Sequence, residues 1–209
     1  MIGGIGKKMG YDYAVKDKTF KKRLGELEYH REQIEALLDI TPTAEFGKNY
    51  AEFYRKGQEA IQKLMAEKQG QVAGAFHRKE LGDIDLVWGE VTDFEKHKGY
   101  GLAHIIDKRK SEFIKQGLSE AEAEVKTMEL INNIPNIISK GKIIRDEKGR
   151  LRIELDNQIL GIKDNWHGTP TNKWIITTYE PRENVRSLYT SPTITKGETL
   201  PLNSSDIIP

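Results

Sequence analysis

The chain has 209 residues with no cysteine, and its 33 basic and 32 acidic residues give a formal net charge of +1. The lack of cysteine excludes disulfide scaffolds, cysteine-ligated zinc sites and thiol nucleophiles, and no apolar run approaches the roughly 20 residues that span a bilayer. The near-neutral balance provides no global attraction for nucleic acid, so any anion-binding site must be local.

Two amphipathic helices are expected near the N-terminus. Apolar residues recur near helical spacing over residues 17–39 and again over 45–68. Thr41-Pro42 separates the two, because the residue before a proline avoids the α region. We therefore interpret residues 1–45 as a helical N-terminal extension.

After the second expected helix, apolar residues alternate with the two-residue period of a β-strand. The segments 71–76 and 83–89 alternate as strands do, and the polar link HRKELGD joins them like a hairpin. A helix is expected over about 100–116. Another opens at Ser119, where Glu122 completes a capping-box pattern.

The C-terminal part is expected to be a strand meander that follows a helix ending near Pro135. Turn-forming residues separate short apolar runs and predict four strands, at 142–147, 150–155, 158–163 and 173–179, with a loop at 164–172. Residues 46–181 would form one domain. Residues 182–209 lack periodicity and are rich in Ser, Thr and Pro, which is typical of a linker or disordered tail.

His104 is the first candidate for chemistry. At about 100° per residue, Leu102 and Ile105 lie on one side of the expected helix, and His104 falls roughly opposite, with Lys108 one turn on. A histidine in that position is either a solvated surface residue or a general acid or base. An unperturbed pKa of about 6.5 suits proton transfer near neutral pH.

The segment KWIITTYE supplies hydroxyl groups. Alternation places Lys173, Thr177 and Tyr179 on one face of the expected strand and Thr178 on the other. A hydroxyl beside a phenol can hold a phosphate oxygen and stack a base. Thr and Tyr are also good strand formers, which explains the same pattern without any function.

Cations and carboxylates give weaker signals. The cations that could stabilise a pentacoordinate phosphorane are Arg78, Lys79, Lys163 and Lys173. Asp83 and Asp85 share one side of a strand, but two carboxylates without a third ligand make a weak metal site. We interpret them as structural or orienting groups and expect neither a metal nor a cofactor.

Three blocks of the chain resemble a known family. GAFHRKELGDIDLVWGE, GYGLAHIIDKR and the strand ending in WIITTYE are similar to the phage-associated endoribonucleases of the barnase–EndoU–colicin–RelE-like class. The resemblance covers about residues 50–181. It implies an α+β fold with N-terminal helices followed by a twisted antiparallel sheet of about four to six strands, with two inserted helices. It also implies metal-independent cleavage of RNA, often tRNA.

The resemblance further implies roles for particular residues. His104 matches the histidine of the GLAHI block, and Thr177 with Tyr179 matches a threonine–x–tyrosine element. EndoU-type nucleases also use a second histidine and a lysine. His77 is the nearest candidate by position for that histidine. The lysines that could take its place are Lys79, Lys163 and Lys173.

The expected reaction is attack of a ribose 2′-OH on the adjacent phosphorus, which yields a 2′,3′-cyclic phosphate and a 5′-hydroxyl. The residues expected to bind the substrate are Arg78, Lys79, Trp88, Lys108 and Thr178. RNA is the expected partner, and a cognate immunity protein or inhibitor is another. The start of the sequence lacks the apolar core of a signal peptide, so we expect a cytoplasmic protein, or one delivered into a target cell by a non-classical route.

The alternative hypothesis is that the protein has no catalytic activity. The chain would then be an inactive module of a phage or mobile-element protein that binds RNA or another protein, and residues 17–68 would be a helical docking arm. The near-neutral charge and the missing second histidine favour this alternative.

Overall fold

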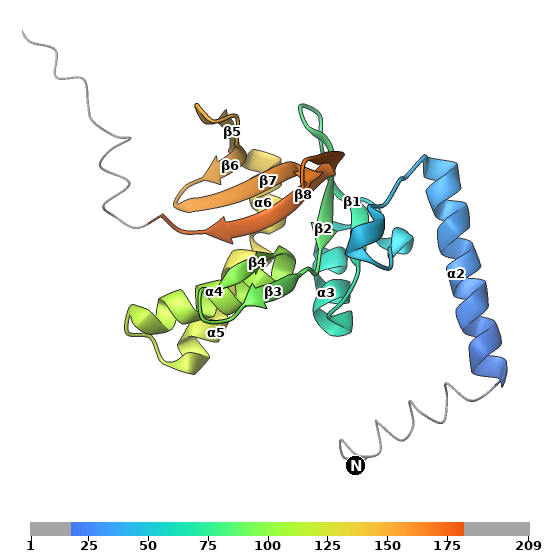
Figure 1. Cartoon of the computed structure of the whole chain (residues 1–209), viewed down its shortest axis with the longest axis horizontal. Helices are drawn as coiled ribbons and strands as arrows, with labels where there is room; N and C mark the ends of the chain where they lie inside the picture. The colour runs from blue at the N-terminus through green and yellow to red at the C-terminus, as the bar shows by residue number, and fades with distance from the viewer. Residues whose placement is uncertain (1–17, 182–209) are drawn as a thin grey trace, which may run out of the picture.

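The computed structural model describes residues 18–181 (Figure 1). In chain order the elements are α2 (Lys18–Leu38), the 3-10 turns η1 (Ala44–Phe46) and η2 (Ala51–Phe53), α3 (Gly57–Glu67), β1 (Gln71–Arg78), β2 (Gly82–Val87), β3 (Glu90–Asp93), β4 (Lys98–Tyr100), α4 (Gly101–Lys115), α5 (Glu120–Asn132), α6 (Ile134–Lys140), β5 (Lys142–Arg145), β6 (Leu151–Leu155), β7 (Gln158–Trp166) and β8 (Thr169–Tyr179). The expectations for residues 1–17 and 182–209 lie outside the described residues.

The α+β fold expected from the sequence is confirmed. Six strands form one sheet in the order β1-β2-β8-β7-β6-β5, and β3 and β4 form a separate two-stranded hairpin. The large sheet is antiparallel except where β2 and β8 pair in parallel. Within residues 18–181, no helix is both long and apolar enough to cross a membrane.

An apolar core covers one face of the large sheet. Leu160 of β7 and Ile175 of β8 belong to the main cluster of buried residues, together with Ile137 of α6. Because side chains alternate along a strand, the residues between them point to the opposite face of β6, β7 and β8. That opposite face is where a site can form.

The first expected helix is confirmed as α2, whereas the second is largely wrong. Only α3 is α-helical within 45–68. The preceding segment is held at the edge of the sheet instead: the backbone N–H of Tyr50 donates to the carbonyl of Gln71, and the N–H of Ala73 donates to Oδ1 of Asn49. These bonds satisfy polar groups at the edge of β1, and they override the helical periodicity of the segment.

Three other features of the structure differ from what the sequence led us to expect. The hairpin of β3 and β4 was not expected from its short, mostly polar strands. The loop at 164–172 is wrong, because β7 and β8 continue to a tight turn at His167 and Gly168, whose φ angles of +47° and +88° suit a two-residue hairpin. Pro135 lies in the first turn of α6, where a proline is tolerated.

Candidate functional site

A bulge in β8 decides which side chains share the open face of the sheet. The register pairs Gly161 with Thr177 and the next residue, Ile162, with Ile175, so that Ile176 is an extra residue in β8. Residues paired across two strands point to the same face of the sheet, and consecutive residues of β7 point to opposite faces. Thr177 therefore points to the open face, whereas Ile175 points into the core.

Two predicted residues are consequently not part of the open face. Lys173 pairs with Ile84, whose side chain is fully buried in the core, so the expectation that Lys173 shares a face with Thr177 is wrong. Thr178 is 0 % exposed, and its hydroxyl accepts a hydrogen bond from Gln158. Its contacts are structural, and it does not reach the surface where a substrate would bind.

Three of the predicted catalytic residues do come together. Lys163, Thr177 and Tyr179 line a hollow of about 420 Å³ on the open face of the sheet. Charged side chains around it are mostly basic, with Arg145, Lys148, Arg150, Arg152 and Lys163 against Asp146 and Asp164. We call this depression the cationic hollow. It is a local concentration of positive charge in a protein whose net charge is only +1.

Local hydrogen bonds fix the rim and the floor of the cationic hollow. Asp146 accepts bonds from the backbone N–H groups of Lys148 and Arg150 and from the Arg150 side chain, and these bonds lower its pKa. At the floor, a Cβ atom on Gly161 would lie 3.0 Å from Cγ2 of Thr177. Because residue 161 is a glycine, no side chain from β7 crowds Thr177 at this point.

Arg109 connects helix α4 to the cationic hollow. Its guanidinium carbon lies 5.6 Å from the centre of the Tyr179 ring, a cation–π contact, and it forms an ion pair with Glu112. The side chain is only 5 % exposed. Sequence reasoning missed Arg109, although a signal existed, because it lies on the same side of the helix as the apolar Leu102 and Ile105.

His104 is buried rather than exposed. Its side chain is 8 % exposed, so both its assignment to a polar helix face and its interpretation as a solvated residue are wrong. The reason is the unexpected β3–β4 hairpin, whose His97 contacts Asp107 and Ser111 on that side of α4. The hairpin and the sheet thus bury α4 from two sides.

Burial changes the chemistry of His104. The loss of solvent lowers its pKa to about 4, and the nearby charges of Lys108 and Arg109 act in the same direction. Its Nδ1 atom is buried without a hydrogen-bond partner. At neutral pH the ring is therefore uncharged.

The remaining predicted residues lie elsewhere. Arg78 donates to the carbonyls of Ile138 and Gly141 at the end of α6, a structural role. Lys79 lies beside it at the β1–β2 turn and does not line the cationic hollow. Trp88 lines a different depression, next to α4.

Two acidic residues on β2 hold the neighbouring segments in place. Asp83 accepts hydrogen bonds from Tyr54 and Arg55 and lies 2.6 Å from Nδ1 of His77. Asp85 is 0 % exposed and accepts a bond from the backbone N–H of Gly74, and burial raises its pKa to about 6. These contacts support an orienting role, and His77 is not among the residues that line the cationic hollow.

Comparison with protein families gives a match. The model of a family described as "phage-Barnase-EndoU-ColicinE5/D-RelE like nuclease1" matches residues 75–185. The matched segment begins within β1 and includes the whole cationic hollow, Arg109 and His104. No curated protein and no solved structure matches the chain.

Proposed function

Because the chain belongs to this family of phage barnase–EndoU–colicin E5/D–RelE-like nucleases, we propose that it is a metal-independent endoribonuclease acting on RNA, with tRNA among its substrates. The observation that carries the proposal is the cationic hollow, where Lys163, Thr177 and Tyr179 meet beside Arg109. The products would be a 2′,3′-cyclic phosphate and a 5′-hydroxyl.

The cationic hollow suits the scissile phosphate. Lys163 and its basic neighbours offset the negative charge that grows on the phosphorane, and preorganised cations act most strongly when water is partly excluded. The Thr177 hydroxyl can donate to a phosphate oxygen, and the Tyr179 ring offers a surface for a base. The nucleophile belongs to the RNA, so the reaction requires no activated water.

His104 is the proposed base that accepts the proton of the 2′-OH. Because burial lowers its pKa to about 4, the ring is neutral at physiological pH and able to take a proton. A base with such a low pKa is weak in the free protein. The negative charge of a bound phosphate favours the protonated ring, so we expect its basicity to rise when RNA binds.

The test is cleavage of total tRNA in EDTA by the wild-type chain and by His104→Gln. His30→Gln is the matched control, because His30 lies exposed on α2. We expect discrete fragments with cyclic phosphate ends, and a loss of about 10²–10⁴-fold in rate for His104→Gln alone. Intact RNA at high enzyme concentration would contradict the assignment of nuclease activity. Equal rates for all three proteins would show that His104 is not a catalytic residue.

One observation favours the alternative of an inactive binding module. His104 is 8 % exposed, so RNA can reach it only if neighbouring side chains move. A module of this kind would retain RNA in the cationic hollow without producing fragments. An immunity protein or inhibitor of the active enzyme would have to cover the same hollow, and acidic side chains would suit that role.

A further inference from the structure

Helix α2 is attached to the rest of the protein by polar contacts. The Arg31 guanidinium donates two hydrogen bonds, of 2.7 and 2.6 Å, to the carboxylate of Glu52 on η2. Glu35 accepts a hydrogen bond from the side chain of Asn49, and Glu28 forms an ion pair with the segment that follows η1. Residues 28, 31 and 35 are three and four positions apart, so they share one side of the helix.

The described side chains of α2 include no buried apolar residue. Arg31 is the only one of them that is buried, and none belongs to the apolar clusters of the core. Figure 1 shows α2 at the edge of the molecule, beside the turns that precede α3 rather than against the sheet. A helix in a protein gains most of its stability by packing an apolar face, and the contacts of α2 with its own chain do not provide that packing.

The apolar residues of α2 are exposed instead. Leu27 is 41 % exposed, Leu38 44 % and Leu37 86 %. Leu27, Ile34 and Leu38 recur at intervals of seven and four residues, so they form one stripe along the helix, and Leu37 borders it. At about 100° per residue, this stripe lies roughly a quarter turn away from the side that contacts η1 and η2. It is therefore open to a second helix.

The charges of α2 are separated along its length. Its first six residues, KTFKKR, contain four basic residues and no acidic one, whereas the remaining fifteen contain four glutamates and a single arginine. Such a helix repels a parallel copy of itself and attracts an antiparallel one, because each basic start then lies beside the acidic part of the other copy. The charge pattern therefore favours a second copy of this chain over a partner of one sign.

We propose that α2 is a self-association surface, on which the stripe of Leu27, Ile34 and Leu38 packs against the same stripe of an antiparallel second copy. Two antiparallel copies are related by a two-fold axis across the helices, so the contact is self-complementary and closes as a dimer. About 30 Å of helix is available for it. The described residues of α2 do not line the cationic hollow, so cleavage does not require the dimer. The dimer is in turn independent of the proposed function.

The mass of the whole chain in solution tests the dimer. Wild type and a Leu27→Ser/Leu38→Ser double variant are compared by sedimentation equilibrium over a range of concentrations. We expect wild type to reach twice the monomer mass. The double variant should have a dissociation constant higher by about 10²-fold or more, because four leucines of the dimer lose their apolar burial. Val125→Ser, on α5, is the matched control, since Val125 is 60 % exposed.

Three results of that experiment would overturn the proposal. The first is a wild type that stays monomeric at every concentration, and the second is an assembly larger than a dimer. The third is a dimer that persists in the double variant or is lost equally in the Val125 variant, because the contact would then lie outside α2.

Cross-linking tests the direction of the two helices. The chain has no cysteine, so Leu27→Cys and Leu38→Cys each introduce a single thiol, about 16 Å apart along the helix axis. A disulfide requires the two Cα atoms to lie within about 7 Å of each other. Both positions meet their own copy in a parallel pair, whereas only a position at the two-fold axis does so in an antiparallel pair. We expect at most one variant to form a linked dimer, and efficient linking of both would contradict the antiparallel arrangement.

A charge reversal tests why the helices pair in that direction. Lys22 is exposed in the basic start of α2 and forms an ion pair with Glu26 at 3.9 Å. Lys22→Glu should raise the dissociation constant of the dimer by about two- to fivefold, because it places a negative charge beside the acidic part of the second copy. The effect should shrink in about 1 M salt. A variant that dimerises more tightly than wild type would overturn the proposal, since a parallel pair would give that result.

Discussion

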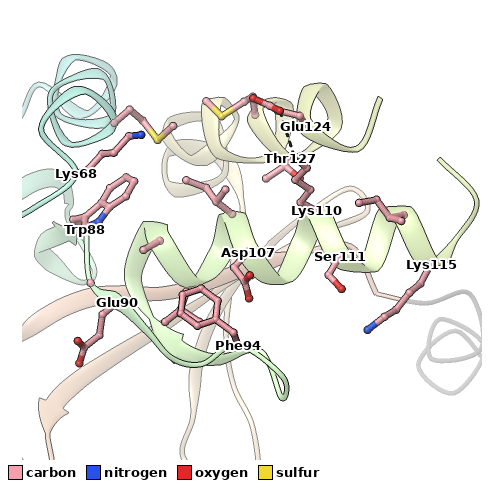
Figure 2. A pocket seen from close by; sticks show the side chains of 17 residues that line it. Lys68, Trp88, Glu90, Phe94, Asp107, Lys110, Ser111, Lys115, Glu124 and Thr127 are labelled. Atoms are coloured by element: carbon pink, nitrogen blue, oxygen red, sulfur yellow. Dashed lines mark ion pairs between the residues drawn. The ribbon is translucent and has the colours of Figure 1, made fainter. Parts of the chain in front are cut away.

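The cationic hollow and a second depression, the apolar groove lined by Trp88, Phe94, Asp107 and Ser111 (Figure 2), differ in the chemistry of their walls. Basic side chains and the hydroxyls of Thr177 and Tyr179 line the cationic hollow, and no histidine is among the described residues that line it. The apolar groove has aromatic walls and lies beside the His97–Asp107 pair. Among the described residues, neither His97 nor His104 lines either depression.

Helix α4 connects the two depressions. Arg109 reaches Tyr179 of the cationic hollow, and Asp107 and Ser111 reach the wall of the apolar groove. His104 is buried on the side of this helix that carries Asp107 and Ser111. The difference teaches that a protein with a net charge of +1 can still concentrate cations on one local surface, which is enough to attract an anion.

The largest expected effect comes from breaking the link between α4 and the cationic hollow. Arg109→Met removes the guanidinium from the Tyr179 ring and from Glu112. We expect cleavage to fall by about 10²–10³-fold and the free energy of unfolding to fall by roughly 1–3 kcal/mol. Rates are measured at a temperature where both proteins are folded, with Arg23→Met on exposed α2 as the control. Unchanged cleavage would show that Arg109 of α4 takes no part in the reaction.

The pH dependence of stability tests the desolvation of His104. Its pKa is about 4 in the folded protein against 6.5 for the free side chain. A lowered pKa means that the unfolded chain binds the proton more readily, so the stability present above pH 6.5 is lost as the pH falls toward 4. The loss would reach about 3 kcal/mol.

The measurement is the free energy of unfolding of wild type and His104→Gln at several pH values. The difference between the two proteins isolates His104 from Asp85, whose raised pKa of about 6 has the opposite effect on stability during acidification. A constant difference between pH 7 and pH 4 would contradict the burial of a neutral histidine.

The smallest expected effect is on the salt dependence of RNA binding, which distinguishes the two depressions. Lys163→Gln in the cationic hollow should weaken RNA binding and reduce the slope of log K against log salt by about 0.7. Lys68→Gln, at the border of the apolar groove, should change the slope less. Binding is measured with His104→Gln as the background, so that RNA stays intact. A larger change from Lys68 would place the main phosphate contacts in the apolar groove.

Local sequence patterns predicted the helices and strands more accurately than they predicted which residues these elements bring into contact. Alternation in KWIITTYE correctly paired Thr177 with Tyr179, but it also placed Lys173 with them, because nothing in the segment marks the bulge at Ile176. The helix over α4 was predicted nearly to the residue. The burial of His104 was not, since it depends on a hairpin of very short strands.

The contact between His97 and Asp107 was beyond the reach of sequence reasoning for a similar reason. His97 and Asp107 are brought together by a turn and the middle of a helix rather than by a recognised spacing. Arg109 was detectable as a charge on an apolar stripe. The division into an extension at 1–45, a domain at 46–181 and a tail stays a prediction.

The most direct test of the central claim is a single 2′-deoxy substitution. An oligonucleotide that the wild-type chain cuts at one position is synthesised again with deoxyribose at the nucleotide on the 5′ side of the cut, and both are incubated in EDTA. The account predicts that cleavage at that position disappears while binding is retained, because the nucleophile has been removed. Continued cleavage at the substituted position, or cutting of DNA, would contradict transesterification by the 2′-OH.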